Sequence, residues 1–116
     1  MIRRRDAALL VAVGGALGSV SRWALALVVP SPWATLSVNL VGCLVIGLLA
    51  GWMFEARPRL RLLVGVGFLG GFTTFSTHLL EGHELAAGPA TAYVAGTLVG
   101  CLALAALGLR AGRRLR

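Results

Sequence analysis

The sequence predicts an all-α membrane protein with four transmembrane helices, the third of them broken in mid-membrane. Two features of composition predict this class: 58% of the 116 residues are hydrophobic and only 13% are charged, whereas soluble domains have about 25% charged residues. A third feature is the spacing of polar turns between apolar stretches, since a spanning helix needs roughly 20 apolar residues. We expect residues 1–116 to form a single transmembrane domain.

The four predicted spans cover residues 7–29, 33–54, 62–80 and 90–109. Pro30 and Pro32 end the first span, because proline removes a backbone donor and restricts the residue before it. A polar turn at residues 55–61 ends the second. The first apolar run is longer than the core of a signal peptide, which has about 7–15 residues, so we expect it to remain as a helix.

The arginines predict the orientation of these spans. The net charge is +7, and ten of the eleven arginines lie in three clusters, at the N-terminus, in the 55–61 turn and at the C-terminus. The connections at 30–32 and 81–90 contain neither Arg nor Lys. Basic residues on alternate connections are typical of the positive-inside rule rather than of a nucleic-acid-binding surface. We therefore expect a multi-pass protein of the cell membrane with both termini in the cytoplasm.

The third span is unusual for a membrane helix. Four glycines between Gly65 and Gly71 precede the run of aromatic and hydroxyl residues at 72–77, and each glycine costs a helix about 1 kcal/mol relative to alanine. We expect a break between Gly70 and Thr74. Non-helical backbone at membrane depth is tolerated where protein or a watery cavity satisfies it, so the break is a candidate binding or conduction site. Alternatively, the glycines only allow close helix packing.

Two polar side chains are stranded inside the first and second spans. Arg22 follows Gly14 and Gly18 at four-residue spacing, so all three share one helix face. An intramembrane arginine indicates a functional site, although its long stem also allows it to reach the interface as an anchor. Asn39 lies centrally in the second span. Its amide can bind an anion or link two helices by hydrogen bonds.

The fourth span carries Tyr93, Thr97 and Cys101 at four-residue spacing, which places their polar groups on one helix face. The acidic residues lie in or near connections rather than in mid-membrane, so the interior suits an anion. Cys43 and Cys101 lie in apolar stretches, where we expect small hydrophobic thiols and no disulfide or metal framework. The chain has no nucleophile elbow and no phosphate loop, and we expect no enzymatic activity.

Three segments of the chain together resemble a known family. The run GFLGGFTTFST at 67–77 closely resembles the signature of the CrcB/Fluc family of fluoride ion channels. Residues 14–23 resemble the first-helix motif of that family, with its paired glycines and later arginine, and residues 35–42 resemble its Thr-Leu-x-Val-Asn-x-x-Gly motif. Each motif is weak alone, but three in order in a four-span chain are highly specific.

The resemblance implies a fluoride-specific channel that exports fluoride passively and so lowers its toxicity in the cytoplasm. It implies an antiparallel, inverted-topology dimer with two pores and a central structural sodium ion, which is not transported. Main-chain oxygens at Gly70 and Thr73 match the sodium positions. Arg22 matches a vestibule arginine. The residues assigned to the fluoride pathway are Asn39, Phe75, Ser76, Thr77, His78, Tyr93 and Thr97.

His78 is a departure from the family pattern, which has a second pore phenylalanine at this position. A histidine keeps polarised ring-edge hydrogens and can add an N–H donor or a charge near neutral pH. One hypothesis is that His78 makes conduction depend on pH. The alternative is that His78 lies beside a conducting pore.

The charge bias also predicts a particular kind of dimer. A chain with every arginine cluster on one side inserts in one orientation, and such a population cannot form antiparallel pairs with itself. We therefore expect a heterodimer with a second, oppositely oriented family member. The alternatives are a non-conducting subunit that supports such a channel and, more remotely, a small multidrug transporter, whose essential first-helix glutamate is absent here.

Overall fold

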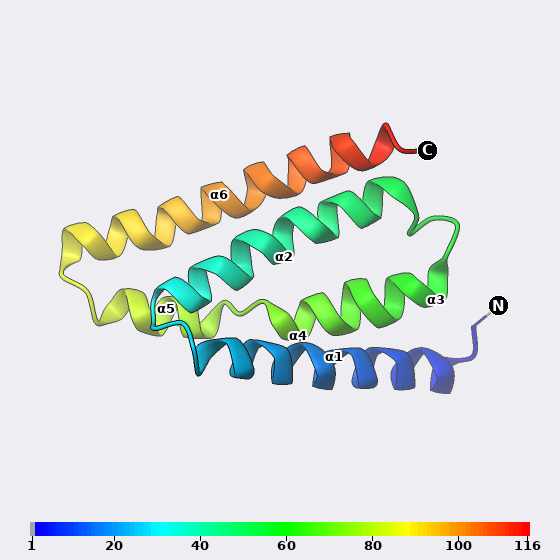
Figure 1. Ribbon diagram of the computed structural model, residues 1–116, viewed down its shortest axis with the longest axis horizontal. Coiled ribbons are helices and arrows are strands. Elements are labelled where there is room, and N and C mark those ends of the chain that lie inside the picture. Colours follow the sequence, from blue (N-terminus) through cyan, green and yellow to red (C-terminus); the bar gives the residue numbers. More distant parts are fainter. Residues whose placement is uncertain (1) are drawn as a thin grey trace.

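The computed structural model describes residues 2–116, and the regular elements within that range are all helical (Figure 1). Most are α-helices, whereas η1 is a π-helix with wider turns. The elements in chain order are α1 (Arg4–Ala26), α2 (Trp33–Trp52), α3 (Pro58–Leu60), η1 (Arg61–Leu69), α4 (Gly70–Phe72), α5 (Ser76–His83) and α6 (Ala87–Arg113).

Four helical stretches are long and apolar enough to cross a membrane, which confirms the prediction of four spans. Their ends differ from the predicted ones: the first and second spans end at Ala26 and Trp52 rather than at residues 29 and 54, whereas the third and fourth extend further at both ends. The first span begins at Arg4 rather than at residue 7, and the fourth extends to Arg113 rather than to residue 109. The third runs from Pro58 to His83, with the proline in the first turn, where it is tolerated.

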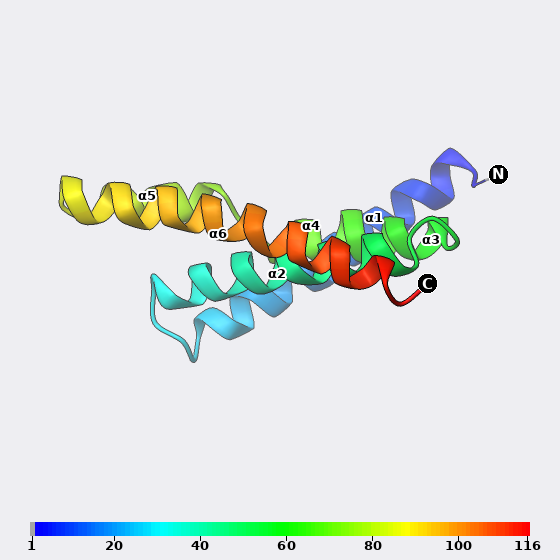
Figure 2. The ribbon, with the colours of Figure 1, turned by 90° about the horizontal axis from the view of Figure 1, so that it is seen from above.

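The three arginine clusters lie at one end of the molecule. Figure 1 shows the N-terminus, the connection between α2 and α3, and the C-terminus at the same end. The connections without arginine lie at the opposite end, where α5 and α6 diverge from the ends of α1 and α2 (Figure 2). The fold therefore separates the charges along its long axis as the sequence predicts.

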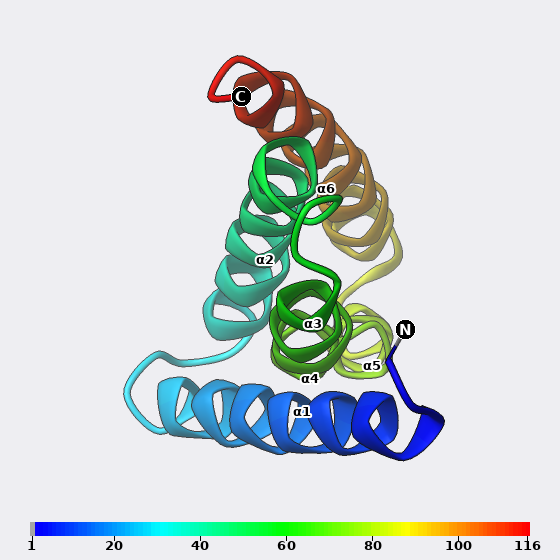
Figure 3. The same cartoon turned by 90° about the vertical axis from the view of Figure 1, so that its right-hand side faces the viewer.

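The third span, built from α3, η1, α4 and α5, lies between α1 on one side and the α2–α6 pair on the other (Figures 1 and 3). Glycines also bring α2 and α6 together within their pair. A Cβ added to Gly47 of α2 would overlap the carbonyl oxygen of Ala105 of α6, and one added to Gly108 of α6 would overlap that of Leu44 of α2. Backbones this close pack without intervening side chains, as small residues permit in membranes.

The contact between α1 and the third span uses the predicted stripe of Gly14, Gly18 and Arg22. A Cβ on Gly14 would overlap the carbonyl oxygen of Leu63, and one on Gly18 would overlap that of Phe68. Arg22 continues the same face, where its Nε donates to the main chain at the end of α4. The four-residue spacing therefore marks a packing face, as predicted.

Candidate functional site

The third span is interrupted between α4 and α5. Thr73 is extended, with φ −79° and ψ 156°, and the next helix begins at Ser76. The predicted break ran from Gly70 to Thr74, but Gly70 to Phe72 are helical and the interruption covers Thr73 to Phe75. Glycine only weakens a helix locally, whereas this break depends on contacts with the neighbouring helices.

Asn39 of α2 provides the strongest of these contacts. Its Oδ1 accepts a hydrogen bond of 2.8 Å from the Thr74 backbone N–H, and its Nδ2 donates a 2.9 Å bond to the Thr74 carbonyl. The side chain is 7% exposed. One buried amide thus satisfies both backbone groups of the residue at the centre of the break, which is what lipid requires of non-helical backbone.

This bond pattern releases the Gly70 carbonyl. In a continuous α-helix the Thr74 N–H would donate to Gly70, but here it donates to Asn39. A Cβ built on Gly70 meets no atom within 4 Å, so open space adjoins this residue. Among residues 2–116 no group of three or more His, Cys, Asp or Glu could hold a metal. A freed carbonyl oxygen is instead a ligand for a hard cation.

The next carbonyl, that of Gly71, is already occupied. The Arg22 Nε donates to it at 3.2 Å, and Ser19 Oγ lies 3.5 Å away. A positively charged donor at the C-terminal end of a helix compensates the partial negative charge of the unpaired carbonyls there. Arg22 therefore stabilises the break from α1, as Asn39 does from α2.

The second half of the span restarts through Thr74. The Thr77 backbone N–H donates to Thr74 Oγ1 at 3.3 Å, and the two threonine hydroxyls lie 3.1 Å apart. A threonine side chain that accepts from a backbone N–H three residues later is a helix cap. Thr74 Oγ1 therefore satisfies one of the free N–H groups in the first turn of α5.

A groove of about 390 Å³ opens beside the break. It brings together residues of α2, the third span and α6, including six of those assigned from the sequence to the fluoride pathway or to the sodium ion. Polar, aromatic and thiol groups all contribute to its lining. Its lining residues are Asn39, Cys43, Gly70, Thr73, Thr74, Phe75, His78, Thr97, Leu98 and Cys101.

His78 is buried in this groove at 1% exposure. Its Nε2 lies 3.4 Å from the Val94 carbonyl, while its Nδ1 is a buried nitrogen without a hydrogen-bond partner in the part of the chain that the structure describes. The ring centroid lies 4.6 Å from that of Tyr93 and 6.4 Å from that of Phe75. His78 thus packs within the groove lining, between the exposed Phe75 and α6.

The hydroxyl groups of α6 point along the predicted face, but their hydrogens are engaged. Thr97 Oγ1 donates to the Tyr93 carbonyl at 2.7 Å, and the Tyr93 hydroxyl donates to Glu81 Oε2 at 2.8 Å. An anion in the groove would therefore have to compete for these hydrogens. Tyr93 itself lies behind His78 rather than among the lining residues of the groove.

Glu81 is the site residue that sequence reasoning missed. We assigned it to the 81–90 connection, but α5 continues to His83 and the Glu81 carboxylate lies between spans. Its Oε1 accepts a 2.7 Å bond from Thr35, opposite the bond from Tyr93. Position 81 follows His78 by three residues, so extending the predicted helix by one turn would have placed it on the same face.

Besides Tyr93, two residues assigned to the fluoride pathway lie outside the groove. Ser76 is exposed at the start of α5. Thr77 lines a separate pocket of about 160 Å³ together with Arg22 and Thr35. The predicted site residues Arg22 and Thr77 therefore lie in a hollow separate from the groove that Asn39, Phe75, His78 and Thr97 line.

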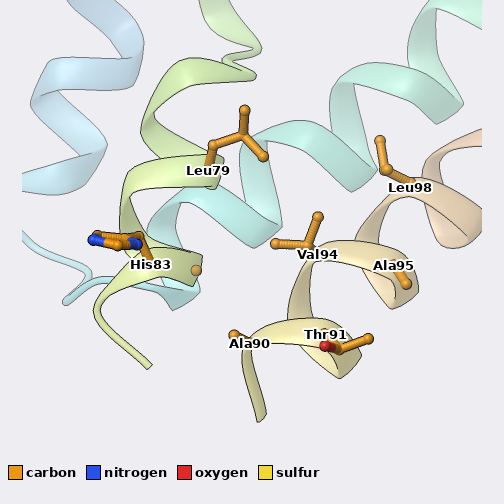
Figure 4. Close-up of a pocket in the computed structure, with 8 residues that line it drawn as sticks. Leu79, His83, Ala90, Thr91, Val94, Ala95 and Leu98 are labelled. Carbon is orange, nitrogen blue, oxygen red and sulfur yellow. The ribbon is translucent and has the colours of Figure 1, made fainter. Parts of the chain in front are cut away.

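A further groove lies between α5 and α6, near their connection (Figure 4). Its volume is about 490 Å³ and most of its lining is aliphatic, from Leu79, Val94 and Leu98 among others. None of the residues predicted for the site lines it. An apolar surface of this kind suits lipid contact rather than an ion.

Comparisons with known proteins agree with the resemblance read from the sequence. Residues 9–109 match the model of a family described as CrcB-like protein, Camphor Resistance (CrcB). The chain is similar to a fluoride-specific ion channel FluC of Rhizobium etli, 56% identical over 67% of this chain and 70% of the relative. It is also similar to fluoride-specific ion channel FluC 1 of Rhodococcus jostii (47% identical; 92% of this chain and 86% of the relative) and FluC 2 of Nocardia farcinica (43%; 93% and 87%).

Proposed function

This chain belongs to the CrcB-like family, and from that membership we propose that it conducts fluoride passively across the cell membrane. Such export would lower the fluoride concentration in the cytoplasm. The relatives are ion channels rather than enzymes, in agreement with the prediction from the sequence. The single observation that carries the proposal is the interrupted third span, held open by Asn39 beside a groove that reaches from α2 to α6.

The groove has groups suited to a small anion. An amide nitrogen carries two hydrogens; Asn39 donates one to Thr74 and lines the groove, which leaves the second for a ligand. Phe75 is 58% exposed at the break, and the edge of its ring carries partial positive charge. We assign the pathway to Asn39, Phe75, His78 and Thr97, with Tyr93 supporting the ring of His78 from behind.

A structural sodium ion fits the same break. The Gly70 carbonyl has lost its helical donor, and Gly70 and Thr73 line two hollows between the third span and α2. Main-chain oxygens of these two residues would hold the ion. Its charge, when bound, would favour an anion nearby.

We further propose that the channel is an antiparallel dimer with a second, oppositely oriented family member. The arginine clusters lie at one end of the fold, and this bias favours insertion with both termini in the cytoplasm. Two relatives carry the numbered names FluC 1 and FluC 2, as expected where one organism has more than one such protein. Reporter fusions at the C-terminus test the orientation: equal cytoplasmic and periplasmic signals would refute it.

A second candidate function is a non-conducting subunit that supports a conducting partner. The observation that favours it is the engagement of the Tyr93 and Thr97 hydrogens, which leaves fewer donors for an anion. A small multidrug transporter remains the remote alternative.

Fluoride efflux from liposomes separates these functions. We expect efflux without chloride efflux from the chain reconstituted with its oppositely oriented partner. Efflux that requires the partner but survives loss of Asn39 and Phe75 from this chain would favour the supporting subunit. Efflux of chloride at the same rate would contradict a fluoride-specific channel.

The pH hypothesis for His78 is tested by the same assay. The groups that face its ring are Tyr93 and Phe75, with Glu81 bonded to Tyr93. We expect efflux to change between about pH 5 and 8, where an ordinary histidine gains its charge, and this dependence to be absent from His78→Phe. A flat profile for the unmodified protein would eliminate the hypothesis.

A further inference from the structure

Two thiols lie at one end of the groove, where they play no part in the proposed conduction of fluoride. Cys43 on α2 and Cys101 on α6 are free and half-buried, and both line the groove. They come from chain segments far apart in the sequence. Their meeting is therefore a product of the fold.

The register of the two helices explains why they meet. Gly47 faces the backbone of Ala105 so closely that a Cβ would overlap its carbonyl oxygen. Cys43 and Cys101 each lie four residues earlier, one turn along the same faces of parallel helices. In agreement with this register, both thiols line the same groove.

We propose that Cys43 and Cys101 form a two-thiolate site for a soft d10 metal cation, such as mercury(II), silver(I) or copper(I). Thiolates select soft cations. Within the described residues no third His, Cys, Asp or Glu joins them in a metal-binding group. The pair therefore matches a metal that accepts two ligands rather than zinc, which takes four in structural sites.

The binding step balances in charge and protons. Two S–H bonds break, two metal–sulfur bonds form, and two protons leave to solvent through the groove. With a divalent cation the two thiolates and the metal are neutral together, which avoids the cost of a net charge in a low-dielectric site. The bound cation would lie beside Asn39 and Thr97 and would obstruct the groove.

The test uses the full chain in detergent, with mercury(II) as the probe and no fluoride present. We expect one mercury(II) per chain, the near-ultraviolet absorption of mercury–thiolate bonds, and protection of both cysteines from maleimide. A small monothiol competitor then removes the metal. Because two linked ligands hold it, the unmodified protein should need roughly a hundredfold more competitor than Cys43→Ser or Cys101→Ser.

A matched control keeps two thiols but separates them. In the double variant Cys101→Ser with Leu102→Cys, the second thiol moves to a position that is 73% exposed on α6. We expect this variant to lose mercury(II) as readily as the single variants do. The proposal is overturned if the unmodified protein releases the metal at the same competitor concentration as these variants, a result that would leave the fluoride proposal untouched.

Discussion

The α2–α6 pair and the pair formed by α1 with the third span use the same packing device, yet only the second contains a break. In both, glycine brings one backbone against another: Gly47 and Gly108 in the first pair, Gly14 and Gly18 in the second. Helix α6 nevertheless continues unbroken from Ala87 to Arg113 although it contains several glycines.

The difference shows that glycine content explains the packing of this protein and does not explain its break. The residues that distinguish the third span are those with polar partners on neighbouring helices. Thr74 is held by Asn39, and the Gly71 carbonyl is held by Arg22. The α2–α6 pair supplies a continuous frame, and the other pair supplies the interrupted backbone at the groove.

The largest expected effect follows from a larger side chain at the close contact between α2 and α6. We expect Gly47→Val to destabilise the folded chain by at least about 3 kcal/mol, because overpacked sites cost about 1–3 kcal/mol and here the clash is with backbone. The loss of stability is measured by heating the protein in detergent and quantifying the remaining folded protein by size-exclusion chromatography. The matched control is Gly96→Val, where a Cβ meets no atom within 4 Å; equal losses for the two variants would contradict the packing account.

Arg22→Gln removes the charged donor from the interrupted pair. A hydrogen bond from a charged group contributes about 1.5–3 kcal/mol, and we expect a loss of stability in that range. Arg57→Gln is the control, because Arg57 is exposed in the cluster between α2 and α3. If thermal stability is unchanged in Arg22→Gln, the arginine does not hold the break.

Glu81→Gln tests the link between the break and α6. A glutamine offers one acceptor oxygen where the carboxylate offers two, so either Thr35 or Tyr93 loses its acceptor. We expect the free energy of unfolding to fall by about 1 kcal/mol. Tyr93→Phe should destabilise the Glu81→Gln variant less than it destabilises the unmodified protein. Glu84→Gln, at an exposed position, should have no such coupling to Tyr93.

The smallest effect is expected at the surface. Arg116 and Glu55 form an ion pair of 2.7 Å whose side chains are 40% and 78% exposed. We expect Glu55→Gln to change stability by less than about 1 kcal/mol, as is usual for exposed pairs. A larger loss in thermal unfolding would show that the C-terminus is part of the core.

Sequence periodicity predicted the parts of this fold that depend on local spacing. The four spans and the shared face of Gly14, Gly18 and Arg22 follow from apolar length and four-residue repeats. The break was predicted in the correct span but assigned to its glycines, because the residue that holds it, Asn39, lies 35 positions before Thr74.

Other features were missed for similar physical reasons. The π-helical turns of η1 depend on packing and have no simple sequence signal. Glu81 was missed because the predicted third span ended three residues too early, and helix ends are the least certain part of a periodic pattern. The hydrogens of Tyr93 and Thr97 have acceptors that only the three-dimensional arrangement identifies.

Fluoride efflux from liposomes that contain Asn39→Leu together with the partner subunit is the most direct test of the central claim. Asn39 holds both backbone groups of Thr74, whereas nearby Ser37 bonds only within its own helix, to the Trp33 carbonyl. The account predicts that efflux is lost in Asn39→Leu and retained in Ser37→Ala. Unchanged efflux in Asn39→Leu would show that neither the amide nor the break it holds belongs to the pathway.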